Sequence, residues 1–172
     1  MRVVLLILRH LLAVMLLPGI VAGVVPAWIR SAQRAGDSRW LHDSWQWWLG
    51  RIGGVVAVAA GLTLAVWCVT LFARVGQGTL APWDPTQRLV VVGPYRYLRN
   101  PMITGVAMLL AGQAIWAGSW KLAVWLAVFV AANHVYFVAV EEPGLVARFG
   151  PAYREYTARV PRWIPRRTPW SN

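Results

Sequence analysis

Residues 102–140 read MITGVAMLLAGQAIWAGSWKLAVWLAVFVAANHVYFVAV, two apolar runs with only residues 117–121 between them. Each run is just long enough to cross a hydrocarbon core of about 30 Å as an α-helix. A connection this short makes the two helices antiparallel neighbours. The sequence therefore predicts a helical hairpin that crosses a membrane and returns, so that the segments before residue 102 and after residue 140 meet at one membrane face.

Two more apolar runs, at residues 5–28 and 52–73, also have spanning length. With 58% hydrophobic and only 13% charged residues, the chain is not an ordinary soluble domain. The polar segments between the runs are too short for a second domain. We therefore predict an all-α integral membrane protein, one membrane domain over residues 1–172, with about four transmembrane helices at 5–28, 52–73, 102–120 and 122–140.

Shorter features complete the predicted fold. Apolar residues between 41 and 49 recur at helical spacing, which predicts a short helix in the membrane interface. Pro18 and Pro26 predict a bent first span, whose freed backbone groups are satisfied by neighbouring helices. The basic and aromatic tail predicts a cytoplasmic helix from about Glu142 to Arg159, because Pro161 cannot continue it.

The net charge of +11 would suggest a nucleic-acid partner in a soluble protein, but here its distribution indicates membrane topology. With the N-terminus in the cytoplasm, twelve of the 17 Lys and Arg residues fall on the cytoplasmic side, as the positive-inside rule expects. We predict both termini in the cytoplasm, a bacterial inner membrane, lipid partners and no nucleic acid. The lone Cys68 and three histidines on different segments predict no disulfide and no metal site.

Two motifs flank the hairpin, GPYRYLRNPM at residues 93–102 and EEP at residues 141–143. Asn100 is a favoured helix N-cap and Pro101 a favoured first helical residue, so this pair explains where the third span begins. It does not explain the Tyr- and Arg-rich residues before it, including Tyr95 and Arg99. Those residues could form a strap over a polar ligand or a plain interfacial anchor.

Glu141 and Glu142 repel each other at a membrane edge, and a helix that ended there would disfavour them further. Ionisable groups in such a place are candidates for a functional site, although Arg99 or Arg148 could simply pair with them. His134 lies two helical turns before Glu141. It either forms a hydrogen bond with a neighbouring helix or acts as the proton acceptor of the site.

Residues 76–165 resemble the membrane methyltransferases grouped with isoprenylcysteine carboxyl methyltransferases and phospholipid (phosphatidylethanolamine) N-methyltransferases. The resemblance rests on the two motifs above and on Phe149-Gly150 with Tyr153 and Tyr156. It implies that S-adenosylmethionine binds at the cytoplasmic face, with Arg99 in the strap. His134, which is inferred from its position alone, would act as a base only if the acceptor must lose a proton. The contacts that the resemblance implies are Leu89, Val90, Tyr95, Asn100, Pro101, Met102, Ile103, Glu141 and Glu142.

The methyl acceptor stays open at this stage. Carboxyl methyltransferases usually have His at the position of Asn100, and their eukaryotic members have Arg at the position of Phe137. Asn-Pro-Met and Glu-Glu-Pro are similar to the phospholipid branch, whereas the tail is similar to the carboxyl methyltransferases. The sequence thus predicts a lipid or small apolar acceptor. The alternatives are a non-enzymatic transporter subunit or assembly factor, and a family fold without activity. Oligomeric state is not predicted.

Overall fold

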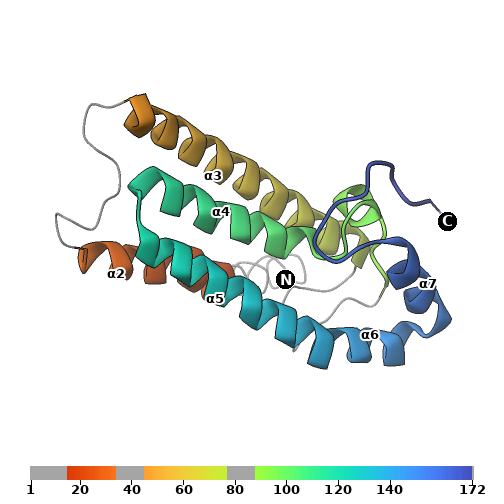
Figure 1. Cartoon of the computed structure of the whole chain (residues 1–172). Helices are drawn as coiled ribbons and strands as arrows, with labels where there is room; N and C mark the ends of the chain where they lie inside the picture. Colours follow the sequence, from red (N-terminus) through yellow and green to blue (C-terminus); the bar gives the residue numbers. More distant parts are fainter. Residues whose placement is uncertain (1–14, 34–44, 77–87, 172) are drawn as a thin grey trace, which may run out of the picture. The chain divides into compact units, whose positions relative to one another are not determined.

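A computed structural model describes residues 15–33, 45–76 and 88–171, and every regular element in these ranges is a helix (Figure 1). The all-α class is therefore confirmed for this part of the chain. The α-helices are α2 (Val25–Ser31), α3 (Trp45–Leu71), α4 (Pro101–Ala117), α5 (Trp120–Tyr136), α6 (Glu142–Phe149) and α7 (Pro151–Arg159). Wider π-helical segments occupy Met15–Val24, Phe72–Gly76 and Phe137–Glu141, and a 3₁₀ turn occupies Gly93–Arg96.

Two continuous helical runs, Trp45–Val75 and Trp120–Phe149, are long and apolar enough to cross a membrane. Only 11% and 6% of their most apolar windows are buried inside the protein. The core helix of a soluble protein would be mostly buried, so these two helical runs are candidate membrane spans. The other two predicted spans are represented by shorter apolar helices, Gly19–Ser31 and Pro101–Ala117. Residues 5–14 of the predicted first span lie outside the described residues.

The predicted tail helix Glu142–Arg159 is two helices, α6 and α7, because the chain turns at Gly150 with φ +55°. Two boundaries also differ from the prediction. The separate interfacial helix is wrong for Trp45–Leu49, because these residues form the first turns of α3; its earlier residues lie outside the described ranges. The fourth span does not end at residue 140 but continues through the π-helical segment Phe137–Glu141 into α6. Glu141 and Glu142 consequently lie inside a helical run, and the dipole penalty of a helix end does not apply to them.

The chain divides into two compact units. The first contains Met1–Thr63 and Gly105–Val130, and the second contains Leu64–Thr104 and Ala131–Asn172. Helices α3, α4 and α5 each contribute residues to both units. All of the candidate site residues named above belong to the second unit.

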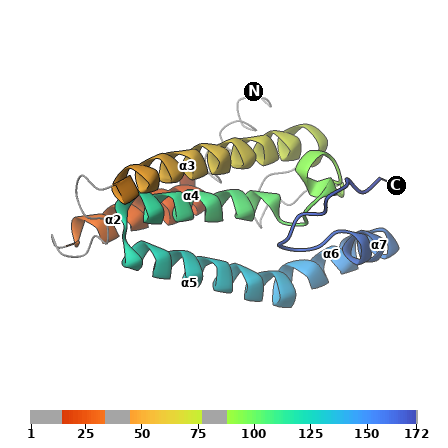
Figure 2. The same cartoon turned by 45° about the horizontal axis from the view of Figure 1, so that its top comes forward.

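Glycines bring α3 and α4 into contact in the first unit, where Figure 2 shows the two helices side by side. A Cβ atom on Gly54 would lie 2.8 Å from the carbonyl oxygen of Gly112, and one on Gly61 would lie 2.5 Å from that of Gly105. Small residues permit such an approach of two helix backbones in a membrane. These small-residue faces therefore pack within the chain.

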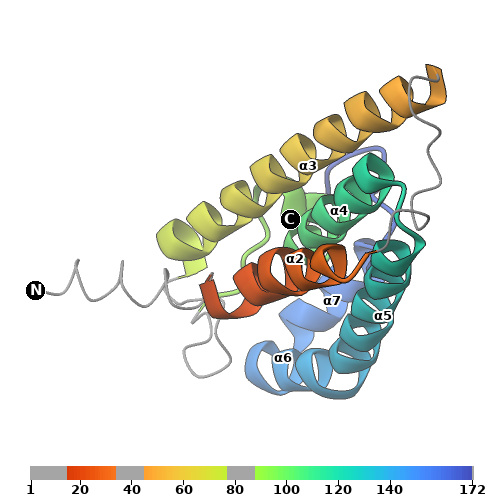
Figure 3. The same cartoon turned by 90° about the vertical axis from the view of Figure 1, so that its left-hand side faces the viewer.

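The segment around Pro26 shows how the first unit tolerates a proline in an apolar helix. Pro26 has no N–H to offer to the carbonyls four and five residues earlier, those of Ala22 and Val21. Gln113 Nε2 donates to the Ala22 carbonyl at 2.8 Å, and Trp125 Nε1 donates to the Val21 carbonyl at 3.0 Å. Side chains of α4 and α5, which lie against α2 and the segment before it in Figure 3, thus satisfy the freed groups as expected.

We expect Gly54→Ala to lower the free energy of unfolding by about 2 kcal/mol, because its methyl group would overlap Trp116 and the α4 backbone. Gly53→Ala is the matched control, since a Cβ atom there meets nothing within 4 Å and Ala favours the helix. The check is the melting temperature of each variant in the same detergent. Equal melting temperatures would contradict the close contact of α3 with α4.

Candidate functional site

The strap, defined here as residues 93–100, begins at a glycine that the backbone requires. Gly93 has φ +57°, a conformation that L side chains rarely adopt. A Cβ atom there would also lie 3.0 Å from Leu71 Cδ1. The 3₁₀ turn Gly93–Arg96 follows, and the strap ends where α4 begins at Pro101, which confirms the predicted helix start. Gly93 therefore lets the chain turn tightly against α3.

Tyr95 anchors the strap in the apolar interior of the second unit. Its side chain is buried in a cluster with Cys68 and Val90, and its ring packs on Phe72 with 5.4 Å between centroids. Burial raises the pKa of Tyr95 well above its ordinary value, so the phenol stays neutral. The Tyr156 hydroxyl donates to the Tyr95 carbonyl oxygen at 2.8 Å. Tyr95 and Val90 thus fix the position of the strap.

The tail after α7 runs along the strap through backbone hydrogen bonds. The Arg99 N–H donates to the Pro161 carbonyl at 2.9 Å, and the Arg166 N–H donates to the Tyr97 carbonyl at 3.0 Å. The Trp170 N–H also donates to the Arg96 carbonyl at 2.9 Å. These bonds hold two segments that are about 65 residues apart in the sequence. A surface cleft of about 280 Å³ opens beside them, lined by Val91, Val92, Arg96, Trp170 and Ser171.

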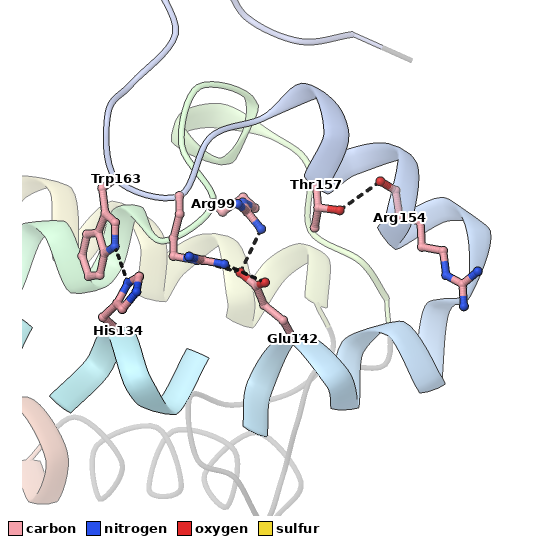
Figure 4. Close-up of polar contacts among 7 residues, drawn as sticks. Arg99, His134, Glu142, Arg154, Thr157 and Trp163 are labelled. Atoms are coloured by element: carbon pink, nitrogen blue, oxygen red, sulfur yellow. Dashed lines mark hydrogen bonds and ion pairs between the residues drawn. The ribbon is translucent and has the colours of Figure 1, made fainter. Parts of the chain in front are cut away.

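Glu142 joins the strap, the tail and α6, as Figure 4 shows for Glu142 and Arg99. Arg99 Nη1 donates to Glu142 Oε1 at 2.8 Å. Arg162 donates to both carboxylate oxygens, from Nε to Oε1 and from Nη2 to Oε2, each at 2.9 Å. The three side chains are 14–21% exposed. The hydrogen bond to Glu142 raises the pKa of Arg162 above its ordinary value, so the guanidinium group stays charged and its bonds to Glu142 are charge-assisted.

Glu141 has no such partner. Its side chain is half-buried, and no hydrogen bond or ion pair joins its carboxylate to any described residue. It closes the π-helical segment Phe137–Glu141, and such segments are frequent at functional sites. Two neighbouring carboxylates therefore have different environments: Glu142 is neutralised by two guanidinium groups, whereas Glu141 has no partner among the described residues.

Two buried donors just before the start of α4 also lack partners within the described ranges, namely Asn100 Nδ2 and Arg99 Nε. Buried polar groups are nearly always hydrogen-bonded, so an orphaned donor needs an explanation. A polar ligand with acceptor atoms would supply one. The free Glu141 carboxylate would complement a cationic group or hydroxyls on the same ligand. This donor and acceptor set suits a small zwitterion that also carries hydroxyl groups.

His134 lies on α5, apart from this cluster, and faces the tail. Its Nδ1 accepts the indole N–H of Trp163 at 3.1 Å (Figure 4). Because Nδ1 accepts, the ring proton of neutral His134 is on Nε2. His134 thus presents a hydrogen-bond donor at Nε2, while Trp163 occupies the nitrogen that could take up a proton.

The remaining predicted residues surround the start of α4 and the tail. Pro101 is fully buried, and Met102 packs against the Tyr95 cluster. Ile103 is half-buried. Leu89 packs against a buried cluster formed by Tyr153 and Tyr156 of α7 and by Val160 directly after it. Among the described residues, no group of three His, Cys, Asp or Glu side chains is placed to hold a metal ion.

Sequence reasoning did not identify Arg162 and Tyr153 as site residues. Tyr153 lies near Arg99 and Glu142, and burial raises the pKa of Tyr153 to about 12, so it remains neutral. Arg162 belongs to a basic tail in which several arginines have similar surroundings in the sequence. Two adjacent carboxylates at the membrane edge indicate that a basic partner is needed, but nothing in the sequence indicates which arginine provides it.

Comparison with known proteins identifies one family. The profile of a family described as phospholipid methyltransferase matches residues 49–152. Searches of curated proteins and of solved structures found no match. The matched segment covers more than half of the chain and includes the strap, α4, α5, His134 and both carboxylates. The chain therefore belongs to the phospholipid methyltransferase family, a family of membrane methyltransferases.

Proposed function

We propose that this chain is an S-adenosylmethionine-dependent methyltransferase of a bacterial inner membrane, with both termini in the cytoplasm and a lipid that enters from the bilayer as methyl acceptor. The observation that carries the proposal is the free Glu141 carboxylate next to Glu142 and the orphaned donors of Arg99 and Asn100. All four residues lie in one compact unit and within the segment that matches the family.

The residues present fit this cofactor. Glu141 would hold its ammonium or ribose hydroxyls, and the Asn100 amide would donate to an acceptor atom. When bound, S-adenosylmethionine supplies a methyl group made electrophilic by the sulfonium. The task of the protein is then to orient the reactants and to exclude water. Glu142 contributes indirectly, because it holds Arg99 and the tail in place.

The acceptor that we favour is a phospholipid headgroup. The family match and the Asn-Pro-Met and Glu-Glu-Pro motifs support this branch. An amine headgroup must lose its ammonium proton before its nitrogen can attack, so a proton acceptor is needed. His134 is our candidate, and it would use Nδ1 after the Trp163 indole has moved away.

We expect His134→Ala to lower the rate of methyl transfer at least about 100-fold while cofactor affinity is unchanged, since general bases contribute that much. Trp163→Phe keeps an aromatic ring against Phe137 but releases Nδ1, so its rate should not fall. The measurement is transfer of radiolabelled methyl groups to vesicle lipids. If the two variants lose the same activity, His134 acts by holding the tail and not as a base.

The first test of the proposal is calorimetric titration of the detergent-purified protein with S-adenosylhomocysteine, with adenosine as the control ligand. We expect micromolar binding of the first and much weaker binding of the second. Methyl transfer is then assayed with vesicles that contain phosphatidylethanolamine. Folded protein that does not bind S-adenosylhomocysteine would overturn the proposal and favour a non-enzymatic membrane protein.

A further inference from the structure

A group of cations and tryptophans in the first unit has no part in the site above. The Cζ atom of Arg51 lies 4.0 Å from the ring centroid of Trp116 and 4.6 Å from that of Trp47. The Cζ atom of Arg30 lies 5.0 Å from the Trp116 centroid. Both guanidinium groups are within the range of cation–π attraction, so Trp116 holds two positive charges close together.

Nothing acidic neutralises these charges in the described part of the first unit. Residues 15–33, 45–63 and 105–130 contain no Asp or Glu. Arg51 Nε is buried and has no hydrogen-bond partner there. Two like charges on one ring repel each other, and an anion would relieve the repulsion and accept the orphaned hydrogen bond.

A cavity of about 240 Å³ adjoins Arg30 and the Trp116 ring that Arg51 shares with it, and its lining residues are Arg30, Gly54, Val55, Val58, Gln113 and Trp116. Its walls are of two kinds. Arg30 and Gln113 are polar, whereas Val55 and Val58 are apolar, and Val55 is 58% exposed on a helix that suits a membrane. Trp45 and Trp48, also exposed, lie near the start of that helix, as tryptophans do at the level of lipid headgroups.

We propose that this cavity binds an anionic phospholipid, with its phosphodiester at Arg30 and Arg51 and one acyl chain along Val55 and Val58. Charge complementarity selects the headgroup, and the apolar wall favours a lipid over a free anion, which would need polar donors on every side. Guanidinium groups pair with phosphate oxygens through charge-assisted hydrogen bonds. None of these residues belongs to the second unit, so the lipid is distinct from the methyl acceptor.

The test is the change in melting temperature of the full chain in detergent on addition of phosphatidylglycerol, phosphatidylcholine or inorganic phosphate. We expect phosphatidylglycerol to give the largest increase. Arg30→Gln and Arg51→Gln should each lose at least half of this increase. Lys121→Gln removes a positive charge from the same unit but not from the cavity, so it should retain the increase.

Native mass spectrometry of the same samples gives a second measurement that does not depend on stability. Folded wild-type protein should retain one phosphatidylglycerol, and folded Arg30→Gln protein should retain none. Equal increases with phosphatidylcholine, or with inorganic phosphate, would overturn the proposal of an anionic lipid. An unchanged increase in both arginine variants, or the same loss in Lys121→Gln, would overturn the proposed location.

Discussion

Replacement of Glu141 by Gln is expected to weaken the binding of S-adenosylhomocysteine roughly 10- to 100-fold while the melting temperature stays the same. A hydrogen bond to a charged group contributes about 1.5–3 kcal/mol, which corresponds to that change in affinity. Stability should be unchanged because no described residue pairs with the Glu141 carboxylate. The measurement is calorimetric titration of the purified variant, accompanied by a thermal melt.

Glu155→Gln is the matched control for this experiment. Glu155 is an exposed carboxylate on α7, so its replacement changes the net charge by the same amount without touching the site. Its affinity for S-adenosylhomocysteine should equal that of the wild type. If Glu141→Gln binds as tightly as Glu155→Gln does, Glu141 is not a cofactor ligand and the proposed arrangement of the site is wrong.

The sequence was sufficient for the parts of this structure that depend on local rules. The apolar hairpin at residues 102–140 follows from length and hydropathy, and the start of α4 follows from Asn100-Pro101. Pro26 implied freed carbonyls, and side chains of neighbouring helices satisfy them. In each case the residues that predict a feature, such as a helix start or a freed carbonyl, lie close in the sequence to the feature itself.

Other features depend on where distant segments meet, and local patterns do not contain that information. Glu141 and Glu142 are adjacent in the sequence and equivalent there. Among the described residues, however, only Glu142 is paired, because the tail returns to place Arg162 beside it. The sequence does not predict the π-helical segment Phe137–Glu141 either, since an apolar run such as Phe-Val-Ala-Val suits an α-helix equally well. Likewise, the helical spacing of the apolar residues does not show whether Trp45–Leu49 form the first turns of α3 or a separate helix.

Glu142→Gln should lower the stability of the protein substantially, whereas Glu141→Gln should leave the melting temperature unchanged. The Glu142→Gln variant would leave the guanidinium groups of Arg99 and Arg162 close together without a counter-charge. Removal of one partner from a fully buried pair costs about 3–5 kcal/mol, and an exposed pair contributes at most about 1 kcal/mol. For side chains that are 14–21% exposed we expect a loss of about 2 kcal/mol, measured by thermal or denaturant unfolding.

A double-mutant cycle separates the pairing with Arg162 from other effects of the substitution. If Glu142 and Arg162 act as a pair, the double variant Glu142→Gln/Arg162→Gln should be clearly more stable than the sum of the single losses implies, by about 1 kcal/mol or more. Arg167→Gln is the control, because Arg167 is exposed on the same tail and should be additive with Glu142→Gln. Additive losses for Arg162 as well would mean that the two hydrogen bonds to Glu142 do not hold the tail. The tail would then be held by its backbone bonds to the strap and by the packing of Trp170 against the buried tyrosines of α7, and Glu142 would be available to the ligand together with Glu141.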